Sequence, residues 1–567
     1  MAQIFLSLVV SITSVGYLQV RTEEFSPEIG TYGGNIILST TSDPRSFNPI
    51  LAKETSTTVI TSLIFEGLTR TDGVTLETLP NLAKSWEVSK DGLTWTFSLR
   101  EDVLWQDGKP FTSEDVVFTF NDLIYNSEIP NSARDIFTIE GEIFKVEKID
   151  NFKVRFTLPK KFAPFLRSMS QEILPKHILS EVVKNKEFNF TWGLDSNPKS
   201  IIGTGPFKLS KYLPSEKVEL ERNPLYWRKD FQGNRLPYLD KIIFLIVPNQ
   251  DTALLKFQEG QLDYYSVRGQ DFPFLKRLEE KKKDFKIFRV GADFGSNFLV
   301  FNQNQSFVKK ERLSWFSDLN FRRAVAYAID REKIISIVMN GFGYPQYSAM
   351  SQSSGFFYNP NVTKYDYNLE KAKSILEEAG YKDLDGDGIL EDRDKNRIEF
   401  NLFTNSGSTE RIQIASIIRK DLERIGVKVN FLALEFNSIV EKLVSTFDWD
   451  CILIGLTGGI EPHFGKNVWC SSGHLHMWYP LQKTPATKWE ERIDKIFDEA
   501  VSELDEFRRK SLYDEWQMIV SENLPLIYTV LSETMFAVRN RFGNLYPTPF
   551  GGAFHNIEEI FIRKKDR

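Results

Sequence analysis

The sequence predicts a multidomain α/β protein with several hydrophobic cores, and three observations support this prediction. The chain has 567 residues, which at roughly 150 residues per domain corresponds to about three or four domains. Segments with the period of a β-strand alternate with amphipathic helical segments along the whole chain. Hydrophobic residues make up 41% and charged residues 26% of the chain, a balance that is typical of globular proteins and excludes fibrous and disordered classes.

The N-terminus carries an apolar run, Ile4 to Val15, which is followed by Gly16. The run has the length of the apolar part of an export signal, whereas a membrane-spanning helix needs about 18 or more apolar residues. Met1 to Gln3 contain no Lys or Arg, so a mis-assigned start or a buried N-terminal strand are the alternatives. We expect residues 1–30 to be a signal-like segment that directs export, or tethers the protein to the membrane if it is not cleaved.

Two segments have the residue pattern of β-strands. In residues 94–100, Trp, Phe and Leu alternate with Thr, Ser and Arg, which predicts a strand with one apolar face. Residues 241–247 form a continuous apolar run that ends at Pro248. This run predicts a short strand that is buried on both faces.

Four segments have the pattern of amphipathic helices. Residues 113–120 begin with acidic residues after Thr112 or Ser113, and either of these two can cap a helix. Each of the other three is followed by a glycine, a residue that commonly ends helices. These helices are predicted over residues 321–340, 369–379 and 410–425, with Gly341, Gly380 and Gly426 after them.

Charge and cysteine content exclude several classes of protein. The chain has 71 Lys and Arg against 77 Asp and Glu, a net charge of −6, so a nucleic-acid binder with a basic surface is not expected. Two cysteines exclude a disulfide-rich scaffold and a zinc site made of four cysteines. Cys451 and Cys470 can pair in an exported protein, but their spacing does not establish a bond. Cys470 with His474 and His476, and His463 upstream, would suit a soft metal. More often, such residues are ordinary loop and strand side chains.

No common catalytic motif is present in the sequence. Neither H-E-x-x-H nor G-x-S-x-G occurs, and spacing singles out no pair of carboxylates as an acid and a base. We therefore name no catalytic residue and expect a binding protein and not an enzyme. A secreted hydrolase is the alternative from another class.

An aspartate-rich segment, residues 383–394, has the spacing of a calcium-binding loop, with Gly388 at its sixth position. The alternative is an ordinary Asp- and Gly-rich turn before a strand at residues 398–402. A structural calcium is the one cofactor that the sequence suggests, and no other is required. Its ligands, at loop positions one, three, five and twelve, would be Asp383, Asp385, Asp387 and Asp394.

Residues 82–120 read LAKSWEVSKDGLTWTFSLREDVLWQDGKPFTSEDVVFTF. This block resembles the signature region of the family 5 extracytoplasmic solute-binding proteins, the oligopeptide-, dipeptide- and nickel-binding components of ABC importers. The resemblance extends from about Gly30 to the C-terminus, and further blocks follow in the family's order. These blocks are residues 43–49, 65–68, 203–207, 221–227 and 320–330.

The resemblance implies a type II periplasmic-binding-protein fold, an α/β fold of two lobes joined by a hinge, with an extra domain inserted into the first lobe. The hinge would consist of two chain crossings, near residues 291–294 and 524–525. By analogy, the first lobe comprises residues 31–67, 201–293 and 524–567, the inserted domain residues 68–200, and the second lobe residues 294–523.

The same resemblance implies the function. The protein would be a periplasmic or otherwise extracytoplasmic monomer that captures oligopeptides between its lobes and delivers them to an ABC permease in the cytoplasmic membrane. Closure of the lobes over the solute would create the state that the permease recognises. The alternative ligand is an oligosaccharide or another small organic solute, which could stack on Trp469 and Trp478.

The order of contact segments in the family selects a set of residues for the cleft between the lobes. For the aromatic members of this set, ordinary core packing is the alternative role. The expected ligand-binding residues are Glu54, Thr55, Ser56, Tyr265, Val267, Asn297, Phe436, Leu456, Thr457, Gly458 and Tyr528.

Peptide binders of this family usually pair an aspartate, just before an acid–proline pair, with the ammonium group of the peptide. The corresponding residues here, Leu456 to Ile460, include no acid, and an ammonium that is buried without a partner is costly. Either Glu461 or another carboxylate takes this role, or the ligand has no free amine there. We therefore expect weak discrimination between free and N-acetylated peptides.

Overall fold

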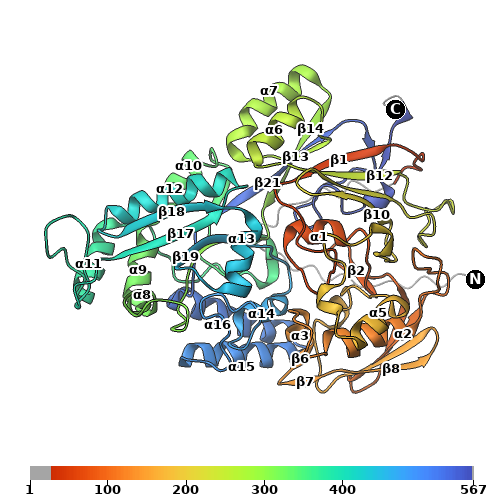
Figure 1. Cartoon of the computed structure of the whole chain (residues 1–567), viewed down its shortest axis with the longest axis horizontal. Helices are drawn as coiled ribbons and strands as arrows, with labels where there is room; N and C mark the ends of the chain where they lie inside the picture. The colour runs from red at the N-terminus through yellow and green to blue at the C-terminus, as the bar shows by residue number, and fades with distance from the viewer. Residues whose placement is uncertain (1–26, 565–567) are drawn as a thin grey trace, which may run out of the picture.

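The structure is a computed structural model that describes residues 27–564, so most of the predicted signal-like segment, residues 1–30, lies outside the described residues. Two lobes lie side by side in Figure 1, with a further domain next to the first lobe at the lower right. Within the described residues, no helix is long and apolar enough to cross a membrane. The architecture is mixed α/β, as the sequence predicts.

The first lobe contains two sheets. In one sheet the strand order is β1-β12-β11-β10, and only the β1–β12 pair is parallel. In the other, β21 lies between β13 and β14 and also pairs with β16. The strands are β1 (Asn35–Thr40), β10 (Phe207–Leu213), β11 (Lys217–Arg222), β12 (Lys241–Ile246), β13 (Tyr264–Ser266), β14 (Phe285–Ala292), β16 (Gly343–Pro345) and β21 (Val530–Arg539).

The strand predicted over residues 241–247 exists as β12, but the prediction that both faces are buried is wrong. Ile242 and Phe244 are buried, whereas Ile243 and Leu245 are partly exposed. The apolar run thus belongs to a sheet that is fully covered on one face only. Three helices complete this lobe: α1 (Thr55–Thr61), α6 (Gln250–Gln258) and α7 (Phe272–Lys282).

The inserted domain is built on an antiparallel sheet of order β4-β5-β9-β8. The strand predicted over residues 94–100 is confirmed as β5, and its Phe97 and Leu99 are fully buried. Thr112 is the cap of the helix that follows, and it forms a capping box with Asp115. The elements are β4 (Ala83–Val88), β5 (Thr94–Leu99), α2 (Ser113–Phe118), β8 (Lys145–Asp150) and β9 (Lys153–Thr157).

The second lobe has one five-stranded sheet of order β18-β17-β19-β15-β20. Separate hydrophobic clusters cover its two faces. Its strands are β15 (Ser296–Phe301), β17 (Glu399–Asn405), β18 (Lys428–Leu434), β19 (Cys451–Leu456) and β20 (Leu526–Tyr528). Its helices are α8 (Lys310–Ser317), α9 (Leu319–Ala328), α10 (Arg331–Ile337), α11 (Leu369–Ala379), α12 (Thr409–Glu423), α13 (Phe436–Glu441), α14 (Lys466–Trp469), α15 (Lys488–Ser502) and α16 (Glu506–Asn523).

Two of the three glycine-terminated helices are confirmed. Gly380 and Gly426, after α11 and α12, both have positive φ angles, of 98° and 80°, which glycine adopts without steric cost. The single helix predicted over residues 321–340 is wrong, because the chain forms α9 and α10 there. Ile329 has extended ψ, and Asp330 accepts a hydrogen bond from Lys333 N and caps α10.

Two adjacent chain crossings connect the two lobes. One follows β14 at residues 293–295, and the other is Thr529, between β20 and β21. In addition, β16, which lies within the predicted second lobe at residues 294–523, reaches over to pair with β21 of the first lobe. Thr529 donates from N and Oγ1 to Asn297 O at 2.9 and 3.0 Å, and Asp293 N donates to Ser532 O at 3.0 Å. The second crossing therefore comes after the predicted position at 524–525, since β20 still pairs with β15 of the second lobe.

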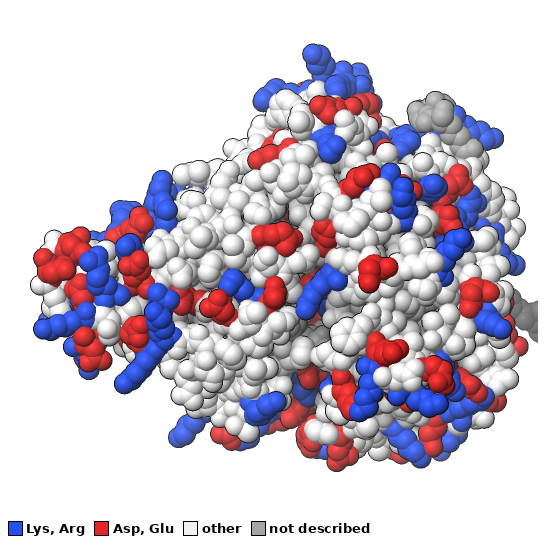
Figure 2. Space-filling view, in the orientation of Figure 1, with Lys and Arg blue, Asp and Glu red and all other residues white. Residues whose placement is uncertain are grey.

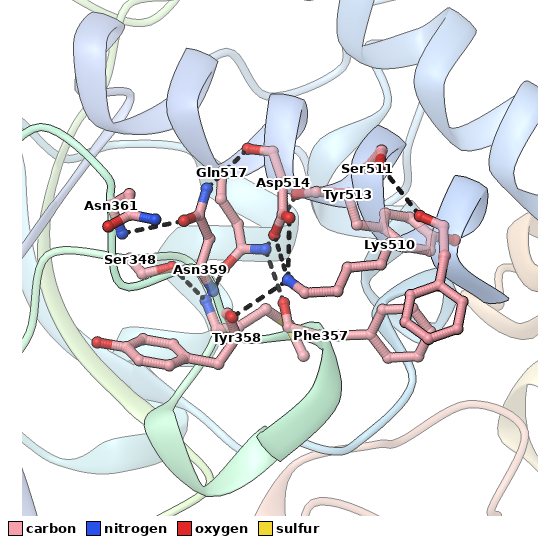
Figure 3. A network of polar contacts seen from close by, with 12 residues as sticks. Ser348, Phe357, Tyr358, Asn359, Asn361, Lys510, Ser511, Tyr513, Asp514 and Gln517 are labelled. Atoms are coloured by element: carbon pink, nitrogen blue, oxygen red, sulfur yellow. Dashed lines mark hydrogen bonds and ion pairs between the residues drawn. The ribbon is translucent and has the colours of Figure 1, made fainter. Parts of the chain in front are cut away.

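A buried glutamine holds residues 348–361, a segment that contains a short 3-10 helix (Gln352–Phe357), against α16 (Figure 3). Gln517 Oε1 accepts hydrogen bonds from Ser348 Oγ and Asn359 N, and Gln517 Nε2 donates to the carbonyl groups of Phe357 and Tyr513. All four bonding positions of a fully buried amide are thus used. The same segment donates hydrogen bonds from serine hydroxyls to main-chain carbonyls at the first crossing, so this network supports the hinge.

Candidate functional site

A cavity of about 1180 Å³ lies between the two lobes. The first lobe contributes the end of β1, β13, the middle of β21 and helix α1, and the second lobe contributes residues 405–414, where β17 ends and α12 begins. Residues 69–71 of the inserted domain also line the cavity. Cavities for drug-sized molecules measure roughly 300–1,000 Å³. This cavity therefore has room for a solute of several residues or sugar units.

The lobes contact one another around the mouth of this cavity. Gln250 N donates to Gly407 O at 3.2 Å, and Arg268 Nη1 donates to Thr409 Oγ1. A Cβ atom at Gly407 would lie only 2.9 Å from Thr41 Cβ of the first lobe. The two lobes therefore touch directly here, and a glycine permits the close approach. On the face shown in Figure 2 the charged side chains are scattered over the middle and gather more densely at the ends.

The structure brings four of the predicted binding residues into the wall of the cavity: Thr55, Tyr265, Val267 and Asn297. Two of them also form hydrogen bonds with neighbouring side chains. Tyr265 Oη donates to Asp271 at 2.6 Å, and Asn297 Oδ1 accepts a hydrogen bond from Arg411 Nε at 2.8 Å. Asn297 therefore links the cavity, the crossings and the start of α12.

The other predicted residues do not line the cavity. Glu54 precedes α1 and pairs with Arg45 at 2.9 Å, and Ser56 is buried within α1. Thr457 and Gly458 are exposed, and Gly458 lies directly against Phe294 O. The remaining three belong to the hydrophobic cluster on the second-lobe sheet: Phe436, Leu456 and Tyr528.

Half of the charged side chains in the wall of the cavity already have partners of opposite charge. Arg268 pairs with Asp271 at 2.6 Å and with Asp251 at 2.7 Å, and Glu533 pairs with Arg289 at 2.8 Å. Arg228 pairs with Glu558, and Glu172 with Lys53. These side chains shape the wall, and their charges are neutralised within the protein.

Five charged side chains of the wall have no ion pair within 4.0 Å among the described residues: Glu66, Arg70, Asp293, Glu410 and Arg411. Of these, Glu66 accepts hydrogen bonds from Asn81, Tyr226 and Trp227. Arg70 Nε is buried without a hydrogen-bond partner. Asp293 accepts a hydrogen bond from Gly295 N through Oδ1. Burial raises the pKa of Glu410 and lowers the pKa of Arg411, because both charged forms are removed from water. The cavity therefore offers both positive and negative groups to a ligand.

Sequence reasoning named none of these five residues as a ligand contact. Asp293 lies inside the predicted first crossing, so its position near a hinge was a usable signal. Arg70 and Arg411 are separated by most of the chain, and no sequence pattern indicates that they face the same cavity. Only the packing of the lobes brings them together.

Several residues that the sequence analysis weighed for other roles are core residues. Trp469 and Trp478 are buried in the second-lobe cluster and do not line the cavity, so they are not available for stacking on a sugar. Cys451 and Cys470 are both free and buried. Burial raises the pKa of both thiols, which disfavours the thiolate that binds metals.

In the aspartate-rich loop, the carboxyl groups that approach one another are those of Asp383, Asp385 and Glu391. Asp387 pairs with Arg397 at 2.6 Å. Asp394, the expected ligand at position twelve, is exposed and is not part of this group. The loop lies at the tip of the second lobe, at the far left of Figure 1, away from the cavity.

Comparison with known proteins gives relatives along almost the whole chain. A "Probable ABC transporter-binding protein" of Deinococcus radiodurans is 30% identical over 91% of this chain and 90% of its own length. The "Oligopeptide-binding protein AppA" of Bacillus subtilis is also 30% identical, over 88% of this chain and 86% of its own.

Two solved structures have the same fold. AppA from Bacillus subtilis in complex with a nonapeptide matches with a TM-score of 0.82 and 28% identity, over 94% of this chain and 100% of that one. MelB from Agrobacterium fabrum in complex with stachyose matches with a TM-score of 0.84 over 96% of this chain and 87% of that one. At 23% identity, MelB is evidence for the fold alone.

The profile of the bacterial extracellular solute-binding proteins, family 5, matches residues 77–474. Proteins of this family bind solutes and are not enzymes. The chain belongs to the bacterial extracellular solute-binding proteins of family 5, and it is a substrate-binding protein of an ABC transporter.

Proposed function

We propose that the solute is a peptide with free termini, held between the lobes and passed to an ABC permease in the cytoplasmic membrane. The observation that carries this proposal is the presence in one cavity of both acidic and basic groups without ion-pair partners. A zwitterionic ligand can neutralise both kinds of group, whereas a neutral sugar neutralises neither. Burial of an unpaired charge is unfavourable, so ligand charge has a large effect on closure.

Asp293 is the best partner for the ammonium group of the peptide. It lies at the first crossing, it lines the cavity, and one of its oxygens is bonded only to Gly295 N. Glu461, which the sequence offered for this role, is not available. It forms a buried ion pair with Arg509, accepts a hydrogen bond from His463 N, and is absent from the cavity wall.

Arg70 is the corresponding partner for the peptide carboxylate, because its guanidinium lines the cavity and makes no ion pair with a described residue. A guanidinium can bind a carboxylate through two parallel hydrogen bonds. The sequence analysis expected weak discrimination between free and N-acetylated peptides. If Asp293 binds the ammonium group, we instead expect the protein to discriminate strongly against N-acetylated peptides.

The relatives support the same ligand class without deciding it. The name of AppA describes an oligopeptide-binding protein, and its structure holds a nonapeptide. The name of another relative, from Rhizobium meliloti and 26% identical, is periplasmic alpha-galactoside-binding protein. The proposal that the ligand is a peptide therefore rests on the charged side chains of this cavity.

Calorimetry on protein that has been unfolded and refolded to remove trapped solute tests the proposal. One peptide is compared in its free, N-acetylated and C-amidated forms, with stachyose as the neutral alternative. We expect acetylation to weaken binding by about 100-fold, which corresponds to about 2.7 kcal/mol. The variant Asp293→Asn should lose this difference while it still binds the acetylated peptide.

The variant Arg70→Gln should in the same way lose the difference between free and amidated peptide. Glu172→Gln is the matched control, because Glu172 lines the cavity but pairs with Lys53 at 2.9 Å. Tight binding of stachyose, or equal affinity for all forms of the peptide, would contradict the proposal.

The proposed location follows from the family. An extracellular solute-binding protein acts outside the cytoplasmic membrane, and we propose that residues 1–30 direct export or remain as a tether. Fractionation of cells that produce the full chain, with intact-mass measurement of the product, shows whether this segment is removed. A full-length protein in the cytoplasm would contradict export.

A further inference from the structure

We propose that the loop at the tip of the second lobe binds Ca²⁺ through Asp383, Asp385 and Glu391, and not through Asp394. One oxygen atom from each of these three carboxylates lies within 4.8 Å of the other two. Three carboxylates at such separations repel one another unless a cation lies between them. Among the described residues none of the three has an ion pair within 4.0 Å.

Glu391 carries the independent evidence for a ligand. The residue is only 4% exposed, and its Oε2 accepts a hydrogen bond from Leu384 N at 2.8 Å. Its Oε1 is buried and has no hydrogen-bond partner. A buried carboxylate oxygen without a partner is costly, and a cation bound between the three carboxylates would satisfy it.

The backbone explains why Glu391 replaces Asp394. Lys382 and Glu391 form an antiparallel bridge, with hydrogen bonds of 3.0 and 2.8 Å between their main chains. The bridge closes the loop at its ninth residue, so Glu391 returns to Asp383 and Asp385. Asp394 lies beyond the bridge, in a separate turn in which Lys395 N donates to Asp392 O. The loop is therefore shorter than the twelve-residue arrangement expected from the spacing.

The remaining loop residues are compatible with a hard cation. Gly386 and Gly388 have positive φ angles, of 79° and 88°, which lets the chain wrap tightly around Asp383. Asp387 is neutralised by Arg397 at 2.6 Å. The ligands are all oxygen atoms, and Asp383 and Asp385 are exposed, so water has access to complete the coordination. This set suits Ca²⁺, which tolerates irregular geometry, better than Mg²⁺, which requires a near-octahedral one.

Terbium luminescence on the full chain, after treatment with a chelator, tests the site directly. Tb³⁺ serves as the probe for a calcium site, and Trp315 serves as the sensitiser, because its Nε1 donates to Asp392 at 2.8 Å beside Glu391. We expect saturable emission that Ca²⁺ displaces with a Kd of roughly 10⁻⁴–10⁻³ M. Mg²⁺ should displace it at least about tenfold less effectively.

The variants separate the proposed ligand set from the twelve-residue one. Asp385→Asn retains the oxygen that accepts from Asp387 N at 3.1 Å, so the turn can persist, and Glu391→Gln retains an acceptor for Leu384 N. Each should weaken Ca²⁺ binding at least about tenfold, with unchanged circular dichroism. Asp394→Asn is the matched control and should bind like the unmodified protein.

Calcium should also raise the melting temperature of the unmodified protein and of Asp394→Asn, but not of Glu391→Gln, because the ion binds the folded state preferentially. Trp315→Phe should lose the sensitised emission and keep this thermal effect. Absence of saturable Tb³⁺ and Ca²⁺ binding in the unmodified protein would overturn the proposal. Loss of binding in Asp394→Asn with retention in Glu391→Gln would overturn the ligand set.

Discussion

The second lobe contacts the rest of the molecule in two regions that differ in chemistry. At the mouth of the cavity the contacts are polar and scattered, such as Asn437 Nδ2 to Asp43 O at 3.2 Å and Gln250 N to Gly407 O at 3.2 Å. Where the second lobe contacts the inserted domain, the contacting groups of the second lobe are buried. Val501 joins the hydrophobic core shared by the first lobe and inserted domain, and its O accepts a hydrogen bond from Ala163 N at 2.8 Å.

His463 is the central polar group of this second region. It is fully buried, its Nε2 donates to Ile136 O at 3.0 Å, and its ring packs edge-on against Phe162. Lys466 Nζ, one turn further on, donates to Thr138 O at 2.8 Å. We infer that this buried contact favours closure without ligand, whereas closure at the mouth depends on the solute that fills the cavity.

The largest effect on stability is expected from removing the buried ion pair next to His463. Glu461 and Arg509 are both buried, and Glu461 also accepts a hydrogen bond from His463 N at 3.1 Å. Glu461→Leu leaves the Arg509 charge without a partner and should lower the free energy of unfolding by about 3–5 kcal/mol. Urea denaturation measures the change.

The exposed pair between Arg492 and Glu515 provides the control for this prediction. Glu515→Leu should cost at most about 1 kcal/mol, because exposed ion pairs contribute little. Similar losses in the two variants would show that the buried ion pair stabilises the protein no more than an exposed one does.

Stability should also depend on pH through His463. Burial lowers the pKa of His463 from 6.5 to about 3, and the positive charges of Lys466 and Arg509 act in the same direction. Below a pH of about 6.5 the unfolded chain binds a proton that the folded protein does not, so stability falls as pH decreases toward 3. The slope is about 1.4 kcal/mol per pH unit.

Urea denaturation at about pH 7 and about pH 5 should therefore differ by about 2 kcal/mol from this residue alone. The variant His463→Gln, whose amide can still donate to Ile136 O, should lack that part of the pH dependence. An identical pH dependence in both proteins would mean that His463 is not buried as a neutral ring.

A smaller effect, on binding and not on folding, is expected at the mouth of the cavity. Gly407→Ala adds a Cβ that would lie 2.9 Å from Thr41 Cβ, across the two lobes. It should weaken ligand binding about tenfold, or about 1.4 kcal/mol, with little change in unfolding. Gly459→Ala is the matched control, because a Cβ there meets no atom within 4 Å.

The smallest signal is the change in shape on closure. If the lobes move as rigid bodies about residues 293–295 and Thr529, ligand should reduce the radius of gyration by a few per cent. Small-angle scattering with and without a bound peptide measures this change. Identical profiles at saturation would show that the cavity fills without movement of the lobes, and the contrast between the two contact regions would then have no role in binding.

Much of the fold could be predicted from local sequence. The alternation in residues 94–100 and the glycines after α11 and α12 indicated elements that the structure contains, because side-chain period and backbone freedom are local properties. The break between α9 and α10 was missed. Asp330 caps the second helix there, and the apolar spacing of the sequence continues across the break.

The sequence by itself determined the family, the α/β class, the expectation of a binding protein and the position of the aspartate-rich loop. Only the tertiary structure decided which charges are free to meet a ligand and which are already paired. Asp293, Arg70 and Arg411 come from distant parts of the chain. Glu461 directly follows Leu456 to Ile460, the segment that corresponds to the family's ammonium-binding aspartate, but its carboxylate pairs with Arg509. An ion pair depends on distance in space, and distance along the chain does not specify it.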